Sequence, residues 1–522
     1  RYPNFIPDAE SLPETSWPDP IRQRPCHPFL TEFIQQRNQA PPCGRATGYC
    51  GRSSMNSRRI PTSRLGSNWS PDARRSAVTL LEKLSHDRCT LEALLDEIDG
   101  TGVIRDPRDR DLLQALVFGV LRWQGRLDFI LSCFSKTPLD KIEPVVRVIL
   151  RLALFQLLFL TRIPASAAVH SAVEIAKAAA GPWVAPFVNA VLRRAAREHF
   201  SVAFPNRETA PVAALSTEWS CPEWLVARWV RLYGVETTAG LCAAINELPP
   251  LTLRANTLKA SRDELAAAVQ PFAAITAAAR TAPDAVHISG LKTALGDLEA
   301  FHQGWFQVQD EAAQLVSILL DPQPGEVVLD ACAGRGGKTG HIAQLMQNRG
   351  HLVALDQSAS RLSQLKDEMR RLGVSSVSAC EADLMQPGAG NGRGPFDRIL
   401  LDAPCSGLGT LRRNPDIKWS ARKKDLQRYH RIQARLLEQA AARLKPDGAI
   451  VYAVCSTEPE ETVDVVKAFL ASNREFRIDG DAAGLPLPVR SIVDVHGFLQ
   501  TYPRLSYMDG FFAVRMSIQT DA

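Results

Sequence analysis

The sequence lacks any apolar run long enough to cross a membrane. Its most apolar stretch, Val145–Leu160, contains Arg147, Arg151 and Gln156. A stretch this short and this charged predicts a buried helix instead. No secretory signal opens the chain. We therefore expect no membrane partner.

Close cysteine pairs are missing as well. The eleven cysteines are scattered along 522 residues, whereas zinc modules place their ligands in closely spaced pairs. The N-terminal group Cys26, His27, Cys43 and Cys50 lacks that spacing too, so we expect no metal. Several other cysteines lie inside apolar patterns, which predicts reduced thiols and not a disulfide framework. We therefore expect a cytoplasmic protein.

The sequence has no large excess of basic over acidic residues. Lys and Arg total 61 against 56 Asp and Glu, which gives a formal net charge of +5. This mildly basic balance permits a nucleic-acid partner without requiring one. A chain of 522 residues predicts two or three domains.

Composition and periodicity divide the chain into parts. Residues 1–70 hold ten of the 35 prolines and show no sustained periodicity, which predicts a disordered Pro-rich extension. Residues 71–200 repeat apolar side chains at three- and four-residue spacing, which is typical of an all-helical domain. We expect a linker at 201–217, a small α+β segment at 218–310 and an α/β domain at 311–520.

Two sets of polar residues leave their role open. Arg254 and Asn256 alternate on one face of a strand-like piece. They could orient a base or a phosphate there, although an ordinary edge strand has the same pattern. Arg193, Arg194 and Arg197 cluster near the end of the helical part. Such a cluster is either a solvated helix face or a phosphate contact.

The stretch Val327–Gly340 reads VVLDACAGRGGKTG and predicts a strand, a tight turn and a helix start. Its glycines let backbone N–H groups approach a ligand closely. Cys332 and Thr339 stand where a phosphate-binding loop and a dinucleotide fingerprint, respectively, need glycine. The loop is therefore glycine-rich but belongs to neither type.

Four consecutive predicted strands end in an acid, namely Asp330, Asp356, Asp383 and Asp402. Open α/β sheets bind ligands at the carboxyl ends of their strands. Asp356 follows the glycine loop at the distance where a carboxylate accepts both hydroxyls of a ribose. Capping of a helix or turn could explain any one of these acids, but it explains the whole set poorly.

Two cysteines, Cys405 and Cys455, fall at the ends of neighbouring predicted strands, on the same edge. A free cysteine is usually a core residue, but this edge is not core. Cys455 also precedes a helix expected to start at Glu458 with Thr457 as its cap, and the helix dipole would favour a thiolate. A thiolate beside a carboxylate suits covalent catalysis. The residues alone do not decide which thiol is the nucleophile.

Ordered motifs along the chain resemble those of the RNA cytosine carbon-5 methyltransferases, especially the bacterial enzymes that act on small-subunit (16S) ribosomal RNA. They are DACAGRGGKT (330–339), LD (355–356), AD (382–383), DAPCSG (402–407), RRNPDIKW (412–419), VCST (454–457) and DGFF (509–512). The helical part is similar to the NusB-like RNA-binding domain of that family. The resemblance implies a class I, Rossmann-like methyltransferase fold with a seven-stranded sheet, S-adenosylmethionine as cofactor and RNA as partner. We expect a monomer.

The resemblance also implies a role for each site residue. Cys455 would add to carbon-6 of cytosine, and Asp402 would hydrogen-bond or protonate ring nitrogen-3. Cys405 would assist proton loss and release of the adduct, and Lys338 would position the base or a nearby carboxylate. Within the cofactor site, Asp356 would take the ribose and Asp383 would lie by the adenine. The implied cofactor-binding residues are Cys332, Ala333, Gly334, Arg335, Gly336, Gly337, Lys338, Asp356, Asp383 and Asp402.

The sequence departs from the family at two positions, and alternatives stay open. Arg335 stands where the family usually has Pro, and Val454 where Thr is common; neither change removes a group that the mechanism needs. The Pro-Cys pair at 404–405 is also where DNA cytosine methyltransferases keep their nucleophile, so only Cys455 points to the RNA family. A methyltransferase for another RNA, such as transfer RNA, and a non-catalytic RNA-binding or ribosome assembly factor are the alternatives.

Overall fold

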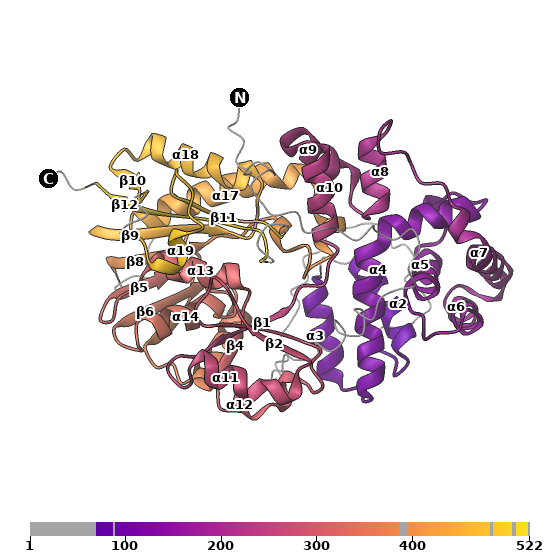
Figure 1. Ribbon diagram of the computed structural model, residues 1–522, viewed down its shortest axis with the longest axis horizontal. Coiled ribbons are helices and arrows are strands. Elements are labelled where there is room, and N and C mark those ends of the chain that lie inside the picture. The colour runs from indigo at the N-terminus through magenta and orange to yellow at the C-terminus, as the bar shows by residue number, and fades with distance from the viewer. Residues whose placement is uncertain (1–68, 87–88, 387–393, 481–483, 504–507, 520–522) are drawn as a thin grey trace. The chain divides into compact units, whose positions relative to one another are not determined.

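The computed structural model describes residues 69–519 except 87–88, 387–393, 481–483 and 504–507. Nearly all of the expected N-terminal extension, including its Cys and His group, lies outside the described residues. The described chain forms two compact units, and the boundary falls between Asn246 and Glu247 (Figure 1).

The first unit is built of α-helices. They are α2 (Ala73–His86), α3 (Leu91–Thr101), α4 (Pro107–Phe134), α5 (Pro144–Phe159), α6 (Ala165–Ala180), α7 (Ala185–Glu198), α8 (Pro211–Glu218), α9 (Glu223–Tyr233) and α10 (Val235–Ala244). Helices α4 and α5 pack closely, because a Cβ on Gly119 would lie only 2.0 Å from Cζ of Phe155. The stretch predicted to be a buried helix is α5, most of which is buried. Among the described helices, none is long and apolar enough to cross a membrane.

The linker predicted at 201–217 is partly wrong, because α8 forms inside it. Pro211 occupies the first turn of α8, where its missing N–H costs nothing. Ala214 and Leu215 give the short helix a buried side. The same compact unit continues through α9 and α10, and the Asn246 side-chain amide closes it by donating to the carbonyl of Trp219 at 2.6 Å.

The second unit begins with a small antiparallel sheet of strand order β2-β3-β1-β4. Its elements are β1 (Leu251–Ala255), α11 (Arg262–Val269), β2 (Ile275–Ala278), β3 (Ala285–Ser289), α12 (Glu299–His302) and β4 (Phe306–Val308). Strand β1 is paired on both sides, so it is not the edge strand that the sequence left open.

A larger sheet follows, with strand order β10-β12-β9-β8-β5-β6-β7 and β11 also paired to β12 (Figure 1). Its strands are β5 (Val327–Asp330), β6 (His351–Asp356), β7 (Val377–Glu381), β8 (Phe396–Asp402), β9 (Leu444–Val454), β10 (Phe476–Ile478), β11 (Phe498–Thr501) and β12 (Phe511–Ile518). Its helices are α13 (Glu311–Leu320), α14 (Gly337–Leu345), α15 (Ala359–Leu372), α16 (Ile417–Ser420), α17 (Lys423–Ala441), α18 (Val463–Ser472) and α19 (Leu487–Arg490).

Strands β5 to β9 run parallel, and helices cover both faces of the sheet. Alternate strand residues enter two cores, as the two-residue period of a strand requires. Val328 and Leu400 pack with α13, α14 and α15, whereas Leu329 and Leu401 pack with α17 and α18. This confirms the predicted Rossmann-like α/β fold.

The predicted count of seven strands is wrong for the described sheet, which has eight. Strand β12 is long enough to pair with two short strands along one edge. Its first half pairs with β11, and its last three residues pair with β10.

Candidate active site

The sheet order brings the four strand-end acids to one edge. Strands β8, β5, β6 and β7 are neighbours in that order. Asp330, Asp356 and Asp402 are the last residues of β5, β6 and β8, and Asp383 lies two residues beyond β7. Because parallel strands end on the same side, all four carboxylates lie at the ligand-binding edge.

The glycine loop connects β5 to α14 and bonds to the end of β6. The backbone N–H of Gly334 donates to Asp356 Oδ2 at 2.9 Å, and that of Ser358 donates to Oδ1 at 2.8 Å. Each carboxylate oxygen has a second acceptor site, which remains available to hydroxyl groups. Gly334 has φ +56°, and a Cβ built on it would meet no described atom within 4 Å. The loop therefore borders open space beside Asp356.

Other residues of the predicted cofactor site differ in exposure. Ala333 is buried and Arg335 is exposed. Burial and the nearby acids raise the pKa of Cys332, which therefore remains a thiol at neutral pH. Asp383 is half-buried, and its Oδ1 accepts from the backbone N–H of Met385 at 2.9 Å, so it also closes a turn.

Asp330 is the most enclosed of the four acids. It is 1% exposed, and its Oδ2 accepts from the Thr339 hydroxyl at 2.7 Å. Burial raises its pKa to about 7, and the charges of Asp402 and Asp356 add to the rise, against the Thr339 hydrogen bond. Its Oδ1 has no hydrogen-bond partner among the described residues.

Lys338 and Asp402 form an ion pair at the centre of the edge. Lys338 Nζ lies 2.6 Å from Asp402 Oδ2 and 5.2 Å from the ring centre of Phe511. Burial would lower the pKa of Lys338, but the charge of Asp402 and its hydrogen bond outweigh burial and raise it. The lysine therefore keeps its positive charge beside this carboxylate.

The two cysteines meet at the ends of β8 and β9. Cys405 Sγ lies 3.2 Å from Cys455 Sγ. The hydrogen bond with Cys455, burial and the charge of Glu461 raise the pKa of Cys405 well above its usual value, against the N–H of Gly407. Cys405 therefore holds its proton more tightly than an ordinary thiol, next to a second thiol within hydrogen-bond reach.

The helix expected directly after Cys455 is absent from this described segment. A short 3-10 turn, η8 (Pro459–Glu461), comes first, and α18 starts only at Val463 with Thr462 at its N-cap. Thr457 is therefore not a helix cap. The expectation that a helix dipole favours the Cys455 thiolate was wrong, because the only nearby turn is too short to carry one.

Arg254 and Asn256 do not face a ligand. Arg254 is fully buried and donates to the carbonyl of Gly337 at 2.8 Å, as well as to three glutamine side chains. These are Gln307, Gln309 and Gln344. Burial lowers the pKa of Arg254 to about 9. The Asn256 amide donates to two main-chain carbonyls at 2.8 Å. Arg254 therefore supports the end of the glycine loop from within, and Asn256 supports the end of α15.

Two residues that bind the site loops were missed by the sequence analysis. Arg413 donates to Asp310 at 2.7 Å and to Asp509 at 2.9 Å, so it ties a motif after β8 to one before β12. Glu461 is completely buried next to both cysteine loops. The signal for Arg413 was its place in a quoted motif. Glu461 looked like an ordinary acid in the first turn of a helix.

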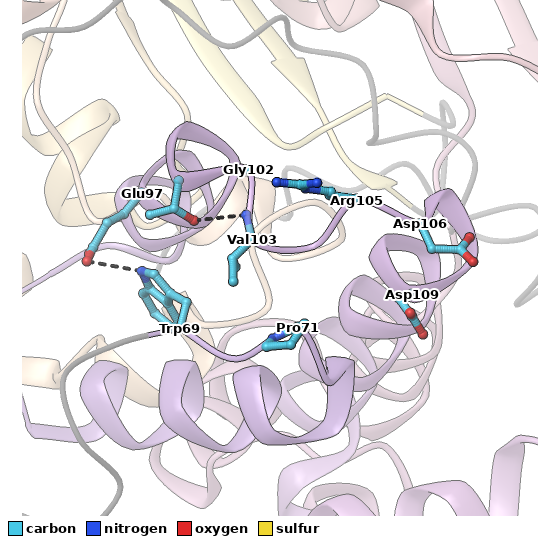
Figure 2. Close-up of a pocket in the computed structure, with 9 residues that line it drawn as sticks. Trp69, Pro71, Glu97, Gly102, Val103, Arg105, Asp106 and Asp109 are labelled. Carbon is cyan, nitrogen blue, oxygen red and sulfur yellow. Dashed lines mark hydrogen bonds between the residues drawn. The ribbon is translucent and has the colours of Figure 1, made fainter.

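A separate pocket of about 810 Å³ lies in the helical unit (Figure 2). Trp69, Glu97 and Arg105 are among the residues that line it, and the predicted site residues are not. In the described part of the chain, no group of three or more His, Cys, Asp and Glu side chains is arranged to hold a metal ion.

Known protein families match three parts of the chain. Residues 317–517 match the family described as 16S rRNA methyltransferase RsmB/F. Residues 71–197 match the NusB family, and residues 221–292 match the ferredoxin-like domain of RsmF/B-like methyltransferases.

Similar proteins and structures extend over most of the chain. The probable ribosomal RNA small subunit methyltransferase B of Bacillus subtilis (strain 168) is 38% identical over 442 residues, covering 84% of this chain and 97% of that protein. Its counterpart in Pseudomonas putida is 37% identical over 401 residues, covering 76% and 88%. The crystal structure of PH0851 is 25% identical with a TM-score of 0.71, covering 86% and 99%. That of a methyltransferase homolog protein from Pyrococcus horikoshii is 27% identical with a TM-score of 0.51, covering 59% and 99%. Because relatives this similar align along nearly their whole length, the chain belongs to the 16S rRNA methyltransferase RsmB/F family.

Proposed function

We propose that this protein transfers a methyl group from S-adenosylmethionine to carbon-5 of a cytosine in small-subunit (16S) ribosomal RNA. The family supports an RNA methyltransferase. The observation that carries the cytosine chemistry is the Cys405–Cys455 pair, 3.2 Å apart at the sheet edge that also holds Asp402. A binding factor has no need of two thiols at that place.

The residues present fit the proposed cofactor. Open space beside Gly334, acceptor sites left on Asp356 and the unpartnered Oδ1 of Asp330 suit a ligand with hydroxyl and amino groups. In this proposal the loop 332–338 holds the methionine part, Asp356 the ribose and Asp383 the adenine. When bound, S-adenosylmethionine would supply an electrophilic methyl group.

Addition of Cys455 to the base is the first chemical step. Its thiolate forms a bond from Sγ to carbon-6, and the electrons of the carbon-5–carbon-6 double bond make carbon-5 nucleophilic. In its protonated form, Asp402 hydrogen-bonds to ring nitrogen-3 or protonates it as negative charge develops on the ring. Lys338, whose Nζ lies 2.6 Å from Asp402 Oδ2, stabilises the carboxylate that remains.

Release of the product is the proposed task of Cys405. Once carbon-5 carries the methyl group, its proton must leave before the double bond can form again. For this step Cys405 must first give up its own proton to solvent; its thiolate then accepts the carbon-5 proton, the carbon-5–carbon-6 double bond re-forms, and Cys455 departs with its bonding electrons. The raised pKa of Cys405 makes that thiolate a stronger base than an ordinary one.

The remaining expectations stay proposals. We propose that the helical part, 71–200, and the small α+β part, 218–310, bind RNA, that 311–520 is the catalytic domain, and that the protein acts as a cytoplasmic monomer.

Methyl transfer from labelled cofactor tests the proposed function. Wild type should label a cytosine in 16S ribosomal RNA or in the assembling small subunit, and sequencing after bisulfite treatment should locate it. If only transfer RNA were labelled, the methyltransferase activity would stand, but the proposed 16S ribosomal RNA substrate would be wrong. Tight RNA binding without label in any RNA would contradict it.

A further inference from the structure

One buried carboxylate contacts both loops that carry the cysteines. Glu461 lies in η8 and is completely buried. Its Oε2 accepts from the hydroxyl of Ser406 at 2.5 Å and from that of Ser456 at 2.6 Å. Its Oε1 accepts from the backbone N–H of Ser406 at 2.8 Å. The carboxylate therefore joins two segments that are 50 residues apart in the sequence.

The two serines directly follow the two cysteines. Ser406 comes after Cys405, and Ser456 comes after Cys455. Main-chain hydrogen bonds join Ala403 to Ala453, near the end of β9, and Gly409 to Cys455. Glu461 supplies a tie between these two points, next to the sulfur atoms.

Glu461 is itself held from two other elements. The Tyr452 hydroxyl, on β9, donates to the main-chain carbonyl of Glu461 at 2.6 Å. The Gln433 amide, on α17, donates to Glu461 Oε1 at 3.2 Å and to the carbonyl of Pro404 at 3.0 Å. Every side-chain contact of this carboxylate named here is with a donor, as an ionised acid requires, and hydrogen bonds to an ionised acceptor are the strong kind.

We propose that Glu461 is a positioning residue that holds Cys405 against Cys455. Without its carboxylate, the two serine hydroxyls and the Ser406 N–H lose their shared acceptor, and the loop at 404–407 is free to move away from β9. The catalytic consequence, failure of the release step assigned to Cys405, rests on the proposed function. The geometric consequence does not.

The conservative variant Glu461→Gln separates positioning from charge. Its amide oxygen can take the place of Oε1 and accept from Ser406 N–H and Gln433. Its NH2 group then takes the place of Oε2 and faces two hydroxyls, which can rotate to accept. Glu461→Gln should therefore keep the loops together, whereas Glu461→Ala should not. Glu438→Ala, which removes an exposed carboxylate on α17, is the matched control.

Cross-linking of the full-length protein by dibromobimane, without RNA or cofactor, measures the pairing directly. Peptide mapping follows the bridge between Cys405 and Cys455. We expect Glu461→Ala to slow this bridge about tenfold, since it removes several charge-assisted hydrogen bonds. Glu461→Gln and Glu438→Ala should react as wild type does. A wild-type rate in Glu461→Ala would overturn the proposal.

Two further measurements keep the result unambiguous. If Glu461→Ala does not fold, the double variant Ser406→Ala/Ser456→Ala must show the slower bridge, and a wild-type rate there overturns the proposal. With RNA and cofactor, Glu461→Ala should accumulate a protein–RNA adduct that Glu461→Gln does not accumulate; equal amounts in both would overturn the catalytic part. If wild type methylates no RNA but the bridge still depends on Glu461, the positioning role stands and the proposed function fails.

Discussion

At the scale of single residues, the Lys338–Asp402 pair is proposed to stabilise the negative charge that develops on the cytosine ring during the addition step. Asp402→Asn keeps the shape of the side chain, but it removes the carboxyl proton proposed for nitrogen-3 and the carboxylate that pairs with Lys338. We expect single-turnover methyl transfer to fall about 100-fold, the usual contribution of a positioned acid or base. RNA affinity, measured by filter binding, should stay close to wild type. Transfer at the wild-type rate would show that another group serves nitrogen-3.

A second prediction concerns Asp330 and the pH dependence of the free energy of unfolding. Its pKa is raised by burial to about 7 from 3.8. The folded state therefore binds this proton more tightly than the unfolded chain, and the stabilisation is complete below the unfolded pKa and is lost as pH rises through about 7. Between pH 5 and 7, wild type should lose about 2 kcal/mol relative to Asp330→Asn, which stays neutral. Urea unfolding of both proteins checks this, and parallel pH curves would refute it.

Residue types at strand ends could be predicted from sequence, but their partners could not. Alternation and the four acids placed Asp356 and Asp402 at one edge, because parallel strands end together. Arg254 was ambiguous, since its inward direction depends on strands from distant parts of the chain. Glu461 was missed for the same reason: its partners lie 55 and 5 residues away, and only the fold brings them together.

At the scale of elements, a glycine contact fixes the loop after Cys405. Gly409 accepts from the N–H of Gly510 at 2.8 Å and donates to the carbonyl of Cys455 at 3.0 Å. A Cβ on Gly409 would lie 1.8 Å from the carbonyl oxygen of Gly510, which is part of the main chain and cannot turn aside.

Gly409→Ala should therefore push this loop away from Gly510, the residue directly before β12. We expect a loss of about 2 kcal/mol in the free energy of unfolding, as for other overpacked sites, and weaker methyl transfer. Gly296→Ala is the control, because a Cβ there would meet no described atom within 4 Å. Equal stability of the two variants would contradict the contact.

The type of an element, helix or strand, was predictable wherever its apolar pattern was clear. The helices between residues 71 and 200 follow from the three- and four-residue spacing of apolar side chains, and strands β5 to β9 follow from apolar runs that end in polar residues. Some short elements were missed. The sequence analysis assigned α8 to a linker, took η8 as the start of α18 and did not identify β11, because none of the three has a long apolar run or a marked end.

At the scale of the whole molecule, the predicted catalytic residues all lie in the second unit, so RNA affinity can be tested apart from chemistry. Arg193 is exposed on α7, whereas Arg194 pairs with Glu198 at 3.0 Å. If this face contacts phosphate, Arg193→Ala should weaken RNA binding and lower the salt slope by about 1. Titrations at several salt concentrations measure the slope. An unchanged slope would identify a solvated face.

The central claim is a covalent bond between Cys455 and cytosine that Cys405 helps to break. Denaturing gel electrophoresis of Cys405→Ala, incubated with 16S ribosomal RNA and S-adenosylmethionine, tests it most directly. The account predicts a protein–RNA adduct that resists denaturation, and its loss in the double variant Cys405→Ala/Cys455→Ala. An adduct that persists in the double variant, or one that forms in Cys455→Ala but not in Cys405→Ala, would contradict the assignment of the nucleophile.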